Sequence, residues 1–287
     1  MKTFLKFVLA SIAASFCAAA LAQPAAELRE PERFTQQELD QILAPIALYP
    51  DSLLSQLLMA ATYPADVEQA ALWSRSNPGL QGEDAVRAVE NEPWDPSVKS
   101  LVAFPQVLAR LAERLDWTRR LGDAFLAQPE QVSDTIQELR HRADVAGNLR
   151  SSEEIVVRRA EDDYIIEPAS PEVVYVPYYD PRDHNGPWWW PEYQPVYWNP
   201  WPGYRWHSGY AGFGWGLGVT LGSSFFYSGF DWPRRFIRFH NHRPFYHRGW
   251  DRHHGHRWWH DGRRDAHNRW RDRGHWRDGR HDGDRSR

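Results

Sequence analysis

The chain has 287 residues, of which 42% are hydrophobic and 25% are charged, so it is long enough to bury a sizeable core. Its formal net charge of −4 hides an uneven distribution: residues 23–233 carry 16 Lys and Arg against 31 Asp and Glu, whereas residues 234–287 carry 16 Arg and 7 Asp. The sequence therefore predicts an acidic body joined to a basic tail. Its single cysteine excludes an intramolecular disulfide and a zinc site with several thiolates.

The N-terminus has the pattern of a cleavable secretory signal peptide. Lys2 and Lys6 precede an uncharged apolar run, which ends at the small-x-small site Ala20-Leu21-Ala22. We expect cleavage after residue 22 and export to the periplasm or the outer envelope. An uncleaved membrane anchor is the less favoured alternative, because the apolar run is short. Phe16 precedes Cys17, where a lipoprotein signal needs a small residue, so a lipid anchor is not expected.

Residues 34 to about 150 are predicted to form short helices. Thr35 and Glu38 have the spacing of a capping box, and Asp51, Asp66 and Asp95 are candidate N-terminal caps. Proline fits only the first turn of a helix, so the prolines of this region should divide it; they stand at positions 45, 50, 64, 78, 93, 96, 105 and 129. The last helix should be the longest, opened by Pro129 and ended by Gly147-Asn148. Its predicted apolar face consists of Val132, Ile136, Leu139 and Ala143.

After Leu149 the pattern changes from helical to extended. β-Branched and aromatic runs separated by turn-forming residues predict a meander of three short strands within 153–179, which would pack on the helices. The next segment, 181–207, is rich in Trp, Pro and Tyr, and proline at this density predicts an extended chain. We interpret its aromatic rings as a strap that fills grooves of the helical domain, with glycan or peptidoglycan contact as the less favoured alternative.

Residues 208–230 contain seven glycines and no charged side chain. The stretch is long enough to cross a bilayer, and Arg234 and Arg235 follow it as a stop-transfer flank would. However, its glycines and serines make it weakly apolar, and the alternation of Phe213, Trp215 and Leu217 suits a strand or a hairpin. Peripheral insertion or packing between copies is favoured over a true membrane span, and membrane association through this segment stays open.

The tail, 231–287, holds ten of the 13 histidines, and its apolar content is too low for it to fold alone, which predicts that it is largely disordered. Arginine pairs bidentately with phosphate, and tryptophan favours the headgroup depth of a membrane. We therefore predict contact with anionic lipid, lipopolysaccharide or another acidic envelope polymer. Arg–Asp pairing within a solubilising tail is an equally weighted alternative, and nucleic acid is not an expected partner of an exported protein. The candidate contact residues are Arg234, Arg235, Arg238, Trp258, Trp259, Arg263, Arg264, Trp270, Arg271 and Trp276.

Metal binding is a second hypothesis for the tail. Neutral imidazole is a good ligand for Ni²⁺, Cu²⁺ and Zn²⁺. However, the histidine spacing matches no folded zinc site, and the neighbouring arginines repel cations. The candidate metal ligands are His240, His242, His253, His254, His256 and His260.

Four stretches of the chain resemble one bacterial family. They read "ILAPIALYPDSLLSQLLMAATYP", "PWDPSVKSLVAFPQVL", "LDWTRRLGDAFLAQPEQVSDTIQELRHRA" and "IIEPASPEVVYVPYYDP", and they span roughly residues 35–185. The chain is similar there to the domain of unknown function 3300 family of exported proteins. The resemblance implies an envelope protein with a helical domain, a short β segment, an aromatic and glycine-rich stretch and a variable tail. It implies no established activity and no catalytic residues.

The sequence as a whole predicts a mainly α protein, in which a proline-broken helical domain is followed by a small β meander and a low-complexity tail. No catalytic motif is found, so the favoured function is a non-catalytic envelope interaction protein without a cofactor, which binds an envelope protein or a second copy of itself. Metal sequestration and hydrolysis of an envelope polymer are the rival functions. The predicted segments are a signal peptide (1–22), a linker (23–33), the helical domain (34–150), the β segment (151–180), the Trp/Pro/Tyr-rich segment (181–207), the uncharged segment (208–230) and the tail (231–287).

Overall fold

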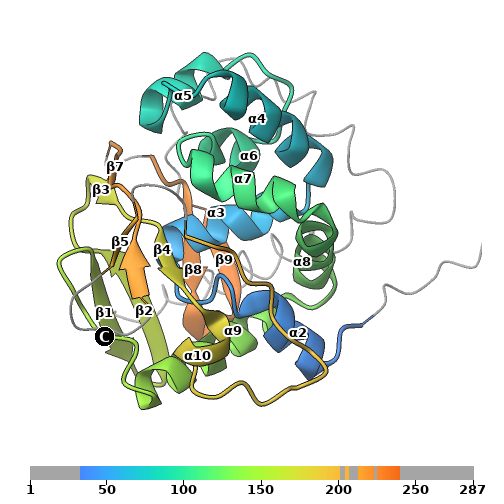
Figure 1. Ribbon diagram of the computed structural model, residues 1–287, viewed down its shortest axis with the longest axis vertical. Helices are drawn as coiled ribbons and strands as arrows, with labels where there is room; N and C mark the ends of the chain where they lie inside the picture. The colour runs from blue at the N-terminus through green and yellow to red at the C-terminus, as the bar shows by residue number, and fades with distance from the viewer. Residues whose placement is uncertain (1–32, 201–203, 207–212, 223–224, 240–287) are drawn as a thin grey trace, which may run out of the picture. The chain divides into compact units, whose positions relative to one another are not determined.

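The computed structural model describes residues 33–200, 204–206, 213–222 and 225–239. The predictions for the signal peptide and for the tail beyond residue 239 lie outside these residues. The described part is mainly helical before residue 150 and forms small sheets after it, as predicted (Figure 1). The helices of the first part are α2 (Gln36–Leu43), α3 (Asp51–Ala61), α4 (Pro64–Ser76), α5 (Gly82–Ala88), α6 (Pro96–Leu101), α7 (Pro105–Glu113), α8 (Leu115–Ala127) and α9 (Pro129–Val145).

Local signals in the sequence set most helix starts. The helices α4, α6, α7 and α9 each begin with proline, where the missing N–H costs no hydrogen bond. The capping box at Thr35 and Glu38 is confirmed, and Asp95 caps α6 by accepting from the Ser97 N–H at 2.8 Å. The predictions for Asp51 and Asp66 are wrong, because neither side chain caps its helix. Both carboxylates bond to other parts of the fold instead, and Asp66 accepts from the Asp95 N–H at 3.0 Å.

The core is built around α3 and α9. Leu53, Leu54, Leu57 and Leu58 of α3 are at most 1% exposed, and α3 contacts α6, α8 and the C-terminal strand β8 (Ser228–Asp231) (Figure 1). Burying one such side chain stabilises a fold by about 1.5–3 kcal/mol, so this helix contributes much of the core. The predicted apolar face of α9 is also confirmed, since all four of its residues are fully buried.

The end of α9 has the predicted glycine termination. Gly147 has a positive φ of 77°, a conformation that costs glycine little and other residues more. The Asn148 N–H donates to the carbonyl of Ala143 at 2.7 Å, and the Gly147 N–H donates to that of Asp144 at 2.8 Å. This pair of bonds closes the last turn and directs the chain into the first strand.

The strands of the second part form two local hairpins and two pairings between segments that lie far apart in sequence. β1 and β2 form an antiparallel hairpin, β3 pairs with β7, and β6 lies between β4 and β5. The predicted three-stranded meander within 153–179 is therefore wrong beyond its first two strands, because the third run pairs with later segments. The strands are β1 (Ile155–Ala160), β2 (Asp163–Pro168), β3 (Val173–Val174), β4 (Pro177–Tyr179), β5 (Arg205–Trp206), β6 (Phe213–Trp215), β7 (Val219–Thr220), β8 (Ser228–Asp231) and β9 (Phe236–Phe239).

Side chains cover both edges of the β1–β2 hairpin. On the β2 edge, the Gln137 carboxamide accepts from the Tyr164 N–H at 2.7 Å and donates to the Tyr164 carbonyl at 3.1 Å. On the β1 edge, the Ser151 hydroxyl accepts from the Val157 N–H at 2.9 Å. These bonds occupy main-chain groups that an added strand would need, so they oppose edge-to-edge association.

One buried side chain, Arg140 of α9, joins the loop before α3 to strand β2. It is 0% exposed, and its Nε and Nη2 donate to the carbonyls of Ala47 and Tyr49 at 2.8 and 3.1 Å. Its Nη1 donates to the Tyr164 carbonyl at 2.9 Å and lies 2.7 Å from Asp51 Oδ1. The guanidinium is therefore matched to three carbonyls and one carboxylate, which compensates a charge that burial would otherwise destabilise.

The Arg140–Asp51 ion pair also contacts Trp232, which lies in the C-terminal part of the chain. Asp51 Oδ2 accepts from the indole N–H of Trp232 at 2.7 Å, and the Arg140 guanidinium carbon lies 4.8 Å from the centre of the Trp232 ring. Burial raises the pKa of the Asp51 carboxyl, while the charge of Arg140 and the Trp232 bond act to lower it. The ion pair thus links three parts of the chain that lie far apart in sequence.

Removing this guanidinium should destabilise the fold strongly. We expect Arg140→Met to lower the free energy of unfolding by about 3–5 kcal/mol, because the buried Asp51 would lose its only positively charged partner among the described residues. The matched control is Arg119→Met on α8, where the arginine is exposed and the cost should stay below about 0.5 kcal/mol. Urea unfolding measures both values, and equal midpoints for the two variants would contradict the role given to Arg140.

Candidate interaction site at the C-terminal hairpin

The described C-terminal part ends in an antiparallel hairpin. β8 and β9 are joined by the short 3-10 helix η1 (Trp232–Arg234), and Arg235 turns the chain with a positive φ of 57°. The tail was predicted to begin at residue 231, and that boundary is wrong for residues 231–239. The reason is local apolar content: Trp232 and Ile237 are each 3% exposed, and the Phe230 ring stacks on Trp232 at 4.0 Å between centres.

Three predicted anion-contact residues lie in this hairpin and face carboxylates of the protein itself. Arg235 Nε lies 2.5 Å from Asp134 Oδ1 of α9, and its Nη1 lies 2.8 Å from Asp163 Oδ1 of β2. Arg234 and Arg238 both pair with Asp231 Oδ2, at 2.9 and 2.7 Å. The last two side chains are more than half exposed, so their pairs contribute little to stability. Arg–Asp pairing within the protein is therefore present at all three positions.

The remaining predicted site residues lie outside the described residues. In the part of the chain that the structure describes, no group of three or more His, Cys, Asp or Glu side chains is placed to hold a metal ion. The residues outside it are Trp258, Trp259, Arg263, Arg264, Trp270, Arg271 and Trp276 for anion contact, and His240, His242, His253, His254, His256 and His260 for metal.

The aromatic segment packs on the helices as the strap interpretation predicts. The indole N–H groups of Trp189 and Trp190 both donate to Asp40 Oδ2 of α2, at 3.0 and 2.7 Å. Trp198 is buried and meets Trp117 of α8 edge to face at 5.1 Å. One detail differs from the prediction, because the segment opens with the single-turn helix α10 (Pro181–His184), which Asp180 caps.

A second buried arginine holds this strap. Arg110 of α7 is 8% exposed, and its guanidinium carbon lies 5.2 and 5.6 Å from the ring centres of Trp198 and Tyr178. Its Nη2 donates to the carbonyl of Asn199 at 3.4 Å. The helical part therefore contacts the C-terminal region through two buried arginines. Arg110 packs against the strap, and Arg140 packs against Trp232 of the hairpin.

The described part of the uncharged segment forms strands rather than a helix. Phe213 and Trp215 of β6 are 5% and 4% exposed, and β6 is hydrogen-bonded on both sides. This agrees with the alternation seen in the sequence. Among the residues described, none of the helices is long and apolar enough to cross a membrane.

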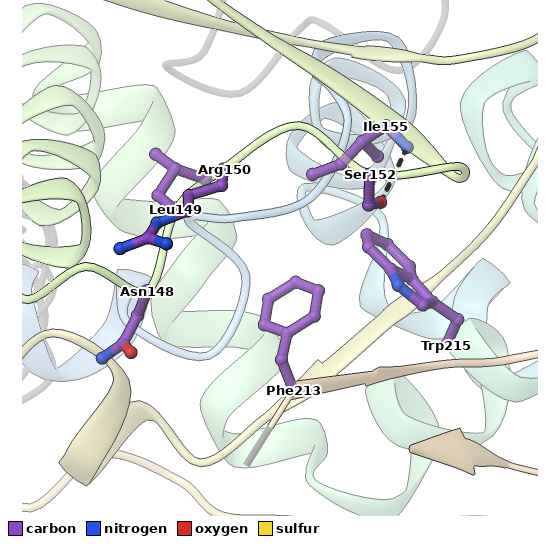
Figure 2. A pocket seen from close by; sticks show the side chains of 7 residues that line it. All are labelled: Asn148, Leu149, Arg150, Ser152, Ile155, Phe213 and Trp215. Atoms are coloured by element: carbon purple, nitrogen blue, oxygen red, sulfur yellow. Dashed lines mark hydrogen bonds between the residues drawn. The ribbon is translucent and has the colours of Figure 1, made fainter. Parts of the chain in front are cut away.

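A small pocket lies where β6 meets the chain after α9. Figure 2 shows the rings of Phe213 and Trp215 on one side and Ser152, bonded to the Ile155 N–H, on the other. The space suits about one water molecule, and the walls are mostly apolar, so its dimensions favour a packing defect over a ligand site. Its other lining residues are Asn148, Leu149 and Arg150.

His184 of α10 is buried beside this pocket. Its Nε2 lies 3.0 Å from the Asn148 carbonyl, the Asn148 side chain donates to the His184 carbonyl at 2.9 Å, and its ring centre is 4.9 Å from that of Phe213. Burial lowers the pKa of His184 to about 4, so the ring is neutral at pH 7. Sequence reasoning missed this residue, because no motif or periodicity surrounds it.

His184 should make stability depend on pH. Between about 6.5 and 4 the unfolded chain binds this proton and the folded one does not, so the free energy of unfolding falls as pH decreases. The full loss is about 3 kcal/mol. We expect His184→Gln to remove this decline, whereas the exposed His141→Gln keeps it. Urea unfolding across the pH range measures the difference, and parallel curves for wild type and His184→Gln would contradict it.

Another buried group of titratable side chains lies between α4 and α6. Burial raises the pKa values of Asp66 and Asp95 and lowers that of Lys99. Each has a structural bond: Asp95 caps α6, Asp66 accepts from the Asp95 N–H, and Lys99 Nζ donates to the Glu90 carbonyl at 2.8 Å. Perturbed pKa values also arise in such structural networks, so this group does not by itself mark a reaction centre.

Comparison with known proteins places the chain in a family. Residues 35–270 match the family described as Protein of unknown function (DUF3300), and the chain belongs to it. It is 40% identical over 253 residues to the uncharacterized protein YacH of Escherichia coli (strain K12), a match that covers 77% of this chain and 41% of YacH. The chain thus spans less than half the length of that relative. No solved structure matches it.

Proposed function

We propose that the protein is exported to the cell envelope and acts there as a non-catalytic interaction protein. Its folded body would hold the basic tail, and the tail would bind a phosphate-bearing envelope surface. The anchoring of the hairpin carries this proposal. Trp232 and Arg235 bond to α3, α9 and β2, so the hairpin that ends at Phe239 is attached to the folded body just before the tail begins.

The charge of the tail supports this role. Residues 240–287 carry 13 Arg and 7 Asp, together with five of the chain's 16 tryptophans and ten histidines. Guanidinium groups pair bidentately with phosphate oxygens, and tryptophan favours the interface of a membrane. The signal-peptide pattern of residues 1–22 would bring such a tail to the compartment where lipid headgroups and lipopolysaccharide present phosphates.

The bonds that the buried ionisable side chains make support a body that has no catalytic role. Asp51 binds Trp232 and Arg140, His184 binds the Asn148 carbonyl, and Asp95 caps a helix. The hydroxyl of Tyr179, whose pKa burial raises, donates to the Ala44 carbonyl at 2.8 Å. Each of these groups is engaged in a bond that holds the fold together.

Binding to anionic vesicles should depend on the arginines of the tail. We expect the full chain to bind vesicles of phosphatidylglycerol and phosphatidylethanolamine, and replacement of the 13 tail arginines by Gln to weaken binding by about 100-fold or more. Binding should also fall as salt rises, because surface electrostatics are screened. Co-sedimentation measures the affinities, with phosphatidylcholine vesicles as the uncharged comparison.

The matched control changes exposed arginines of the body. Arg75→Gln, Arg119→Gln and Arg150→Gln in one chain should leave vesicle affinity nearly unchanged. Unfolding midpoints equal to that of the wild type would show that both variants keep the fold. If the tail variant bound anionic vesicles as tightly as the wild type at low salt, the proposal would be wrong.

A further inference from the structure

The exposed side of α9 and the adjoining β1–β2 turn form an acidic surface. Along α9, acidic side chains recur every four residues and therefore lie in one row. The turn between β1 and β2 adds further carboxylates, and α9 contacts both β2 and β9 (Figure 1). We call this surface the α9 acidic face; its residues are Glu130, Asp134, Glu138, Glu161 and Asp162, all exposed.

This face already binds one arginine of the basic C-terminal segment. The Arg235 guanidinium lies between Asp134 of the face and Asp163, which directly follows Asp162. A second arginine, Arg142, pairs with Glu138 from the next turn of α9 at 2.8 Å. The contacts show that the geometry of the surface suits guanidinium groups, which favour carboxylates in fixed positions.

We propose that the α9 acidic face is the docking surface for residues 240–287 of the same chain. The charge signs are complementary, because the face is acidic and this segment carries 13 Arg against 7 Asp. The docking would extend an interface that Arg235 has already established. Forty-eight residues follow Phe239, and at about 3.3 Å per extended residue they reach much farther than the distance across a domain of this size.

The docking would regulate the proposed function. A tail tethered to the body meets the face at an effective concentration in the millimolar range, so weak contacts are enough to keep it bound. An anionic envelope surface would compete with the face for the same arginines. This consequence rests on the proposed function, whereas the intramolecular contact does not and is tested without any vesicle.

A spin label on the tail locates its contacts. The label is placed by Ser286→Cys in the full chain, with Cys17→Ser so that only one thiol reacts. At low salt we expect paramagnetic broadening of the backbone amides of Asp134, Glu138 and Asp162, and at high salt its loss, because the Debye length shortens. The unlabelled protein gives the reference spectrum.

Two matched variants separate docking from general attraction between the charges. Glu138→Gln with Asp162→Asn removes two charges from the face and leaves the partners of Arg235 in place. Glu68→Gln with Asp84→Asn removes two exposed charges from α4 and α5, which lie at the other end of the body from α9 (Figure 1). One residue of each pair has an arginine partner, Arg142 or Arg87.

The outcomes are distinct. The proposal predicts that the face variant reduces the broadening on α9 by about three-fold, whereas the control variant retains it. Equal reduction in both variants would overturn the docking surface, because net charge alone would then explain the contact. Absence of broadening on α9 in the wild type at low salt would also overturn it. Either result leaves the vesicle experiment unaffected, so the two proposals fail separately.

Discussion

The rest of the structure depends on the contacts that the buried guanidinium of Arg140 makes with three backbone carbonyls and with Asp51. A charged side chain without exposure is stable only if its environment replaces the water that it lost. Here the replacement comes from three backbone carbonyls and Asp51, which belong to the loop before α3, to strand β2 and to α3. Because Asp51 also binds Trp232, the helical part and the C-terminal hairpin share one polar centre.

The contacts of Asp51 illustrate why the body of the protein carries an excess of acidic side chains. Acidic side chains of the first half receive the N–H donors of the second half: Asp40 binds two tryptophans, Asp51 binds Trp232, and Asp134 binds Arg235. The excess of carboxylates in the body is therefore partly used to fold the later segments onto it. The proposed envelope contact would be made by the arginines that follow β9 in the sequence.

Sequence reasoning succeeded where the physical cause is local. The capping box at Thr35, the prolines that open helices and the glycine after α9 each act within a few residues, and their patterns were sufficient. The strap was also predictable in kind, because a dense set of large aromatics must bury area against a neighbouring surface.

It failed where the cause is a distant partner. The pairing of β4 with β6 depends on residues more than thirty positions apart, and two- or three-residue strands carry little pattern of their own. The hairpin beyond residue 231 was missed because its composition resembles the tail, although Trp232 finds a buried acceptor 181 positions earlier. His184 and the α9 acidic face likewise arise from assembly in three dimensions.

The claim that the C-terminal hairpin completes the helical body is tested most directly by two truncated chains. At high salt, which screens the docking of the tail, a chain that ends at Phe239 keeps Trp232, Arg235 and both strands, and its free energy of unfolding should equal that of the full chain within about 0.5 kcal/mol. A chain that ends at Asp231 loses the buried indole of Trp232, which is one of the two partners of Asp51, and its free energy of unfolding should fall by about 3 kcal/mol or more. Equal stability of the two truncated chains in urea unfolding would contradict the account.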